Sequence, residues 1–418
     1  NFSYSKDKFS ALVDLSHYSG SNIYTNDMNY YYPSEHWSQK MSNKKIYRGL
    51  SALTTLSYKI NDYNTVGFQF NGGHNYNGSR EKTRTISNQN GQIVKDFSTN
   101  SRVKGDGDYY NMNVNYNHKF DSVGKKFSVD LDYMSNKGNN GNDFISDMYF
   151  KQDRKTILAN NLNNKDIENA SGKVDFYFPF KKGTWEFGSK VSSTKSDYQL
   201  NSNFTDLATN VDLMTQDDHF KYTENVESLY VSFQRKLSDK WSTKIGLRGE
   251  YTQSKANSLT TNSVTEKEYF KLFPTFYVQY QPKENHSFNL NFGRRIQRPS
   301  FWELNPNKWY SNPISYTEGN PFIQPSFVYN VELSYGFKDY IQAKVYYQNM
   351  QDGFGQIAFH GEEELDGELT QTQVFKRLNY YKMSSYGIVL SSTVKPTKWW
   401  ESNLELSLSY NKSINEID

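Results

Sequence analysis

The residues best suited to chemistry are three closely spaced arginines, Arg294, Arg295 and Arg298. A guanidinium group presents a planar fork of donors, which pairs with a carboxylate through two hydrogen bonds. Two carboxylates, Glu303 and Glu318, follow in the same segment. This part of the chain therefore predicts either contacts to a ligand or an internal network of ion pairs that shapes the segment itself.

The segment that follows the arginines is rich in proline. It holds half of the ten prolines of the chain, namely Pro299, Pro306, Pro313, Pro321 and Pro325. Proline fixes its own φ angle and restricts the residue before it. We therefore expect an ordered connection here, not a flexible tether.

Other groups that bind metals or catalyse reactions are dispersed. The chain has no cysteine, and its seven histidines show no metal-ligand spacing. Phosphate-binding and hydrolase motifs are missing, so we expect no enzymatic activity, no cofactor and no metal site. The acidic run 362–368 and the stretch Gly105-Asp106-Gly107-Asp108 offer oxygen ligands without EF-hand spacing, and we expect a solvated loop and a loop turn there.

Composition narrows the class of protein. Only 35% of the residues are hydrophobic, below the usual 45–50%, yet 17% are aromatic, which argues against disorder. The net charge of +3 gives no overall attraction to nucleic acid. No apolar run approaches the roughly 18–20 residues of a membrane helix. The chain starts within an alternating pattern at Asn1 and stops in a polar stretch, so we expect an internal portion of a longer protein.

The elements that must position these residues are strands. In 400–410, apolar Leu404, Leu406 and Leu408 alternate with polar residues. Such alternation predicts strands with one apolar and one polar face, and hence an all-β fold. Similar segments contain Phe9/Ala11/Val13/Leu15, Met112/Val114/Tyr116, Phe127/Val129/Leu131/Tyr133, Val174/Phe176/Phe178, Leu229/Val231/Phe233, Ile245/Leu247, Phe288/Leu290/Phe292, Val331/Leu333/Tyr335 and Ile341/Ala343/Val345/Tyr347.

Short and long connections alternate along the chain. Tight polar turns are expected at 5–8, 59–64, 121–126, 179–184, 237–240, 281–286, 337–340 and 395–398. Long loops are expected at 17–46, 72–107, 136–171, 194–221, 253–267, 297–326 and 350–373. Between them we expect about fifteen strands and the tail of one more, each of about 9–14 residues, as in outer-membrane barrels.

Short periplasmic turns, long extracellular loops and strands of this length are typical of a transmembrane antiparallel β-barrel. Charged residues in the clearest strands, such as Lys244, Arg248 and Glu250, fall on the face opposite the apolar one, as a bilayer requires. We therefore expect residues 1–418 to be one barrel domain. A secreted β-sandwich or propeller would need more apolar residues and shorter strands. Aromatic residues that fit interfacial girdles are Tyr63, Phe120, Trp185, Trp241, Tyr280, Tyr340, Trp399 and Trp400.

The segment 286–337 also carries a family resemblance. It reads Arg294-Arg295-Ile296-x-Arg298-Pro299-Ser300-Phe301-x-x-Leu304-Asn305-Pro306, then Glu318-Gly319-Asn320-Pro321, then Asn330-x-Glu332-Leu333-x-Tyr335. This pattern resembles the barrel of TonB-dependent outer-membrane receptors, in the β-barrel family abundant in Bacteroidota. The segments 246–252 and 272–275 are also similar, so the specific match covers about 220–340; 374–410 fits more loosely.

The resemblance implies a location in the bacterial outer membrane and a barrel of 22 strands, of which this chain supplies about 15–16. It further implies an N-terminal plug domain, absent here together with the terminal strands, that is moved by TonB to import a solute captured by the extracellular loops. Implied partners are outer-membrane lipid, TonB through the plug and an unidentified solute, with a surface lipoprotein as a possible addition and no nucleic acid. Two alternatives stay open: a passive porin without a plug, and a barrel subunit of a surface-binding or secretion complex.

Within that frame, Arg295, Arg298, Trp302 and Trp309 are candidate contacts to ligand or plug at the outer mouth. The alternative is an internal network of ion pairs and turns, which we favour because the pattern is shared by receptors for different solutes. Segments 20–40 and 135–165 are rich in Tyr, Asn and Asp, including Tyr30, Tyr31, Tyr32, Trp37 and Asn139 to Asn142. They suit carbohydrate or peptide recognition, or plain loop packing.

Overall fold

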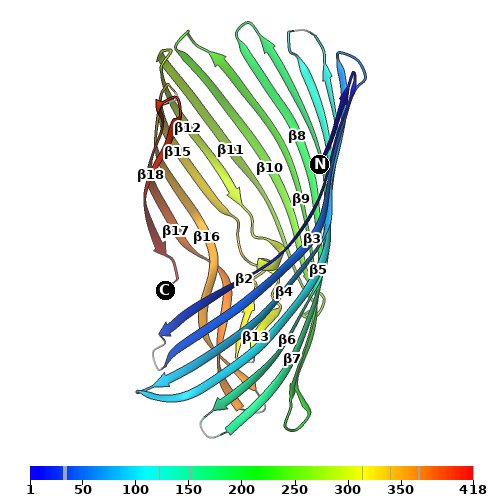
Figure 1. The fold of residues 1–418 in the computed structure, drawn as a ribbon, viewed down its shortest axis with the longest axis vertical. Helices are drawn as coiled ribbons and strands as arrows, with labels where there is room; N and C mark the ends of the chain where they lie inside the picture. The colour runs from blue at the N-terminus through cyan, green and yellow to red at the C-terminus, as the bar shows by residue number, and fades with distance from the viewer. Residues whose placement is uncertain are drawn as a thin grey trace.

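The computed structural model describes residues 1–31, 35–121, 123–150, 153–312, 314–338, 340–365 and 368–417. In this part of the chain, 18 strands form one sheet that curves into a tall, barrel-shaped wall (Figure 1). The strands are β1 (Phe2–Lys6), β2 (Phe9–Tyr31), β3 (His36–Lys59), β4 (Asn64–Gln89), β5 (Gln92–Lys119), β6 (Lys126–Phe150), β7 (Asp153–Phe180), β8 (Gly183–Asp206), β9 (Val211–Lys236), β10 (Trp241–Ser258), β11 (Ser263–Lys283), β12 (His286–Gln297), β13 (Lys308–Asn312), β14 (Ser315–Glu318), β15 (Ser326–Phe337), β16 (Ile341–Leu365), β17 (Glu368–Thr397) and β18 (Trp400–Asn415). The helix α1 (Phe301–Leu304) lies between β12 and β13.

The wall is an antiparallel meander. Each strand from β1 to β12 pairs with the next, β12 then pairs with β15, and the series continues to β18. The short strands β13 and β14 stand apart from this series, within the connection between β12 and β15. The described wall therefore has about sixteen strands, as expected from the sequence. No register between described residues joins β18 to β1.

The predicted tight turns all join wall strands at one end of the barrel, the upper end in Figure 1. Side-chain oxygens close two of them locally. The Oδ1 atom of Asn61 accepts hydrogen bonds from the backbone N–H groups of Tyr63 and Asn64, and Oδ1 of Asp121 accepts from three backbone N–H groups at 3.1 Å. Such Asx turns are set by residues close in sequence, which is why the pattern located them.

Six of the seven predicted long loops are wrong, because the structure has paired strands there. Most wall strands do not stop after 9–14 residues; β2 has 23 residues, β7 has 28 and β17 has 30, so most long connections are extended hairpins. Their tips are themselves tight, as at Asn90 and Gly91, which both have positive φ. A strand needs an apolar face only where lipid or a core covers it, whereas backbone pairing continues equally well between polar residues in water. Polar stretches of this chain therefore form strands and not the predicted loops.

The two faces of the wall differ as predicted. On β10, Ile245 and Leu247 are about half exposed on the outer face, while Glu250 and Thr252 are buried on the inner face. On β18, Leu404, Leu406 and Leu408 are exposed in the same way. Among the described residues, no helix is long and apolar enough to cross a bilayer. The outer face is thus an apolar surface suited to lipid, and the polar face lines the lumen.

Candidate functional site

The one long connection that is not a hairpin turns into the barrel. We call residues 298–325 the inner segment; it contains α1, β13 and β14 and lies in the lumen (yellow in Figure 1). It begins with a compact turn in which the Glu303 carboxylate accepts hydrogen bonds from both the backbone N–H (2.9 Å) and the hydroxyl (2.8 Å) of Ser300. These bonds satisfy donors at the start of α1.

The inner segment is anchored on β10 by a buried ion pair. The Nη2 atom of Arg298 lies 2.6 Å from Oε2 of Glu250 and donates to Thr252 Oγ1 at 3.1 Å. The other carboxylate oxygen of Glu250 lies 2.6 Å from Nη2 of Arg248. Since only 5% of the Glu250 side chain is exposed, water screens this pair weakly. Arg298 therefore holds the beginning of the inner segment against the wall.

A second set of contacts anchors the inner segment on β17, across the lumen. The Arg377 guanidinium lies 4.5 Å from the ring centre of Trp302 and 3.8 Å from the Glu303 carboxylate. Further along, Lys376 lies 2.8 Å from Glu318, and β14 pairs with β17 in parallel. The inner segment thus bridges two walls of the barrel.

The four predicted contact residues do not form one cluster. Arg298 is in the ion pair with Glu250, and Trp302 is about half exposed under Arg377. Arg295 is exposed, shares the lumen face of β12 with Asn289 and Asn291, and has no ion pair within the described residues. Trp309 is partly buried on β13, opposite Thr317. Their contact with a ligand or plug stays a prediction.

The hairpin of β13 and β14 is the centre of a hydrophobic cluster that we call the mouth core. The rings of Tyr310 and Tyr316 lie 5.1 Å apart, and Phe204 from β8 meets Tyr310 edge to face at 5.1 Å. Most of these side chains come from the far ends of the long hairpins, so the cluster packs the hairpin of β13 and β14 against the end of the wall away from the tight turns. Its buried members are Trp37, Phe97, Phe144, Met148, Ile157, Ala159, Phe204, Tyr310, Ile314, Tyr316 and Val374.

A buried charge pair stabilises the edge of the mouth core. The carboxylate of Glu35, between β2 and β3, accepts hydrogen bonds from Ser87 Oγ (2.6 Å) and Trp37 Nε1 (2.8 Å) and lies 3.2 Å from Lys95 Nζ. Burial tends to raise the pKa of Glu35, but the two hydrogen bonds and the Lys95 ammonium outweigh it, so this pKa lies below its ordinary value. Glu35 is therefore ionised at neutral pH.

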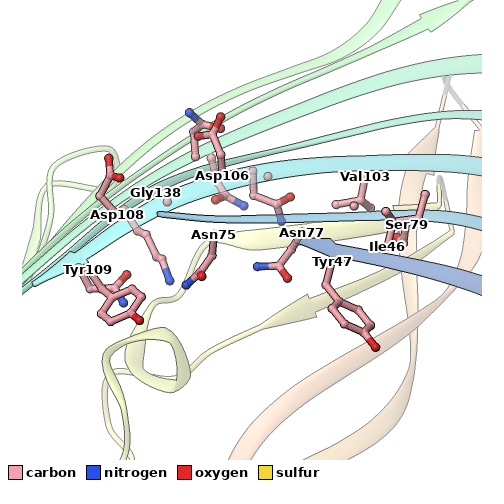
Figure 2. Close-up of a pocket in the computed structure, with 18 of the residues that line it drawn as sticks. Ile46, Tyr47, Asn75, Asn77, Ser79, Val103, Asp106, Asp108, Tyr109 and Gly138 are labelled. Atoms are coloured by element: carbon pink, nitrogen blue, oxygen red, sulfur yellow. The ribbon is translucent and has the colours of Figure 1, made fainter. Parts of the chain in front are cut away.

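A separate hollow of about 520 Å³ opens on the lumen face of β3 to β7, and we call it the lumen hollow (Figure 2). Its floor contains Gly107 of β5 opposite Gly138 of β6. In Figure 2, Tyr47, Asn75, Asn77 and Tyr109 point to one side of the sheet, while Asp106 and Asp108 point to the other. The lumen-facing residues are Lys45, Tyr47, Asn75, Asn77, Ser79, Val103, Gly105, Gly107, Tyr109, Asn136, Gly138, Asn140, Asn163 and Lys165.

The structure corrects one expectation about this region and adds one feature that the sequence did not reveal. The stretch 105–108 is not a loop turn: it lies inside β5, where alternation sends its glycines inward and its aspartates outward. The hollow itself was missed, because it needs the register that brings β3 to β7 side by side. The Asn-rich and Tyr-rich composition of 135–165 was the available signal.

Metal ligands do not converge in the described part of the chain. No three His, Asp or Glu side chains there are placed to hold an ion. His74 and His219 instead pair with single aspartates, Asp108 at 3.0 Å and Asp197 at 2.8 Å. The side chains of 363–370, in the acidic run, lie outside the described residues.

Comparison with known proteins agrees with this architecture. A family model described as "Outer membrane protein beta-barrel family" matches residues 118–418. A search of curated proteins finds no significant match.

Similar solved structures include the copper transporter OprC (TM-score 0.57, 10% identity), the siderophore receptor PiuA from Acinetobacter baumannii (0.53, 12%) and the ferric-catecholate import receptor Fiu from K12 E. coli (0.53, 9%). The alignments cover 98%, 99% and 97% of this chain but 63%, 64% and 65% of those proteins. The chain therefore spans just under two thirds of their length, and at such identity the likeness is one of fold.

Proposed function

Because the chain belongs to the outer membrane protein beta-barrel family and lies in the bacterial outer membrane, we propose that it is the wall and inner gate of a TonB-dependent receptor. The receptor captures a solute outside the cell and imports it when TonB moves a plug domain. It acts as a transporter and not as an enzyme. The anchoring of the inner segment on β10 and β17, together with its packing in the mouth core, is the observation that carries this proposal.

A passive porin needs an open aqueous path along its lumen. Here the inner segment lies in the lumen (Figure 1), and the mouth core packs its hairpin against the ends of the long strands with almost fully buried side chains. Breaking one buried ion pair costs about 3–5 kcal/mol when a partner is left uncompensated. A solute can pass only if such contacts are displaced, which favours an energised importer over free diffusion.

The same contacts weigh against a barrel that only scaffolds partners. A scaffold has no need for a segment held inside the lumen by ion pairs to two walls. The similar structures, a copper transporter, a siderophore receptor and a ferric-catecholate import receptor, support uptake as the activity. The plug domain and TonB are partners of the whole protein in this proposal, and a surface lipoprotein is an additional partner only if one co-purifies.

Two measurements on the full-length protein test the proposal. First, liposomes containing the protein are placed in isotonic arabinose or stachyose, and swelling is followed by light scattering beside a known porin. We expect no swelling above that of protein-free liposomes; porin-like swelling with arabinose would contradict the proposal. Second, the purified periplasmic domain of TonB is titrated onto the protein. We expect saturable binding, and its absence would remove energised import.

A further inference from the structure

Several polar side chains that line the lumen hollow have no hydrogen-bond partner within the described part of the protein. Within the described residues, Asn77, Asn136, Asn140 and Asn163 make no side-chain hydrogen bond. Each carries two N–H donors and one oxygen acceptor. Some asparagines elsewhere on the same lumen face are paired, among them Asn43 with Glu81, Asn113 with Asp132 and Asn169 with Thr194, each at 2.7 Å.

The floor of the hollow is kept open by glycine. A Cβ atom on Gly107 would lie 2.9 Å from the carbonyl oxygen of Lys137, and one on Gly138 would lie 2.9 Å from that of Asp106. Such close approaches to backbone exclude larger residues without a shift of the sheet. The resulting volume of about 520 Å³ lies within the range of roughly 300–1,000 Å³ that is typical of small-molecule sites.

The charges of the hollow are compatible with an anionic ligand, so a ferric chelate must be compared with neutral ligands by experiment. Two lysines, Lys45 and Lys165, face the lumen there, but the hollow is not lined by any arginine, the side chain that binds anions through a paired fork. Its two carboxylates, Asp106 and Asp108, point to the outer face (Figure 2).

The position of the hollow argues against an extended peptide. Peptides commonly bind to sheets by adding a strand to a free edge. Here β4, β5 and β6 pair on both sides along the hollow, so their backbone groups are already used. A ligand must be recognised by side chains alone.

Sugars match the asparagine and tyrosine side chains of the hollow. Their hydroxyls both donate and accept hydrogen bonds, as amides do, and the apolar faces of their rings stack on aromatic side chains. Tyr47 and Tyr109 flank Asn75 and Asn77 on the lumen side (Figure 2). Gly107 lies about 12 residues along β5 from the tight turn, or roughly 40 Å of strand; at a tilt of about 35–45° this is a height of about 28–33 Å, just beyond the apolar band of about 25 Å. The hollow is therefore in the half of the lumen nearer the cell exterior.

We propose that the lumen hollow binds a neutral oligosaccharide, with Tyr47 and Tyr109 stacking against sugar rings and the free asparagine amides binding hydroxyls. This inference rests on the proposed function and names the substrate class of the receptor. It also assigns residues on the barrel wall, outside the inner segment, to specificity.

The test uses full-length protein in detergent and isothermal titration calorimetry. The probes are neutral hexasaccharides built of glucose, xylose, mannose or galactose, with a Gly-Ser hexapeptide and ferric citrate for comparison. We expect at least one hexasaccharide to bind, whereas the peptide and ferric citrate do not compete with it. Failure of every hexasaccharide to bind at up to ~10 mM, a millimolar affinity being the weakest useful one, overturns the proposal.

The chain provides matched control variants on opposite faces of the same strands. The double variant Asn140→Ala/Asn163→Ala removes lumen amides, and Asn139→Ala/Asn164→Ala removes their outer neighbours. Loss of two hydrogen bonds predicts roughly tenfold or greater weakening in the first and less than about twofold in the second. Equal weakening by both would overturn the proposal.

A second pair guards against a folding defect. Tyr109→Leu removes a lumen ring, whereas Tyr110→Leu removes the adjacent ring on the outer face, where Tyr110 stacks with Phe70. We expect only Tyr109→Leu to weaken hexasaccharide binding while heat-modifiable migration stays native; no selective loss would contradict the assignment. TonB binding is measured on the same samples. Loss of sugar binding with TonB binding retained refutes this inference alone, whereas loss of TonB binding with sugar binding retained refutes only the import mechanism.

Discussion

Replacing Arg298 by methionine tests whether the buried ion pair holds the inner segment. The substitution keeps most of the aliphatic stem and removes the guanidinium that lies 2.6 Å from Glu250. Glu250 would then remain almost fully buried, with Arg248 as its one remaining ion-pair partner among the described residues. Breaking a buried pair costs about 3–5 kcal/mol, and the retained Arg248 reduces this to about 2–3 kcal/mol. The inner segment should therefore open about 30–150 times more often.

Hydrogen exchange of three backbone N–H groups reports this opening. Asn305 donates to the Phe301 carbonyl at 3.0 Å, Gly319 to that of Asn305 at 2.9 Å, and Asn320 to that of Glu303 at 2.7 Å. When closing is faster than exchange, the exchange rate is proportional to the open population. We expect these amides to exchange about 30–150 times faster in Arg298→Met, while amides in the middle of β10 keep their native protection.

The matched control is Arg295→Met, three positions earlier, which removes an exposed guanidinium with no ion pair among the described residues. Its effect should stay within about 0.5 kcal/mol, or roughly twofold in exchange. If Arg298→Met left the three amides within about threefold of native, or if both variants accelerated exchange equally, the ion pair would not be the anchor.

Three further outcomes are expected around the inner segment and the mouth core. Lys95→Met should cost about 3–5 kcal/mol in local stability, because it leaves a buried carboxylate, and adding Glu35→Gln should recover part of the loss; limited proteolysis at the β2–β3 tip measures both. Because the pKa of Glu35 is lowered in the folded protein, its contribution is present above the unfolded pKa of about 4.3 and is lost as pH falls through the lower folded value. Proteolytic protection should therefore drop as the pH falls below about 4.3 in the native protein, with a smaller drop in Glu35→Gln. Gly319→Ala should loosen the inner segment by about 1–3 kcal/mol, since its Cβ would lie 2.4 Å from the carbonyl oxygen of Asn305, and unchanged exchange of the Asn320 amide would contradict this.

Part of the candidate site was readable in the sequence. The arginines, the prolines and Glu303 marked 298–325 as ordered, and the structure holds this segment by ion pairs and a compact turn. The partner of Arg298 was not readable, because Glu250 lies 48 positions earlier on another strand. Arg377, which contacts both Trp302 and Glu303, was missed for the same reason.

The length of the strands could be predicted from the sequence only in part. Alternation of apolar and polar residues is visible where one face meets lipid, and it ends where both faces meet water. Beyond that level the strands continue as polar hairpins, for which the best local signal was a turn such as Asn90-Gly91. A search for such turns within the polar stretches would have shortened several predicted loops.

The sequence by itself determined the wall: which residues face lipid, where the tight turns lie and that the fold is a β-barrel. These features depend on neighbours a few positions apart, through the two-residue period of a strand and the short reach of Asx turns. Only the tertiary structure decided that the inner segment enters the lumen and that the mouth core packs around Tyr310. It also decided that Gly107 lies opposite Gly138 at the floor of the lumen hollow, near the free asparagine amides. Those features depend on strand register and on contacts across the barrel, which join residues far apart in the chain.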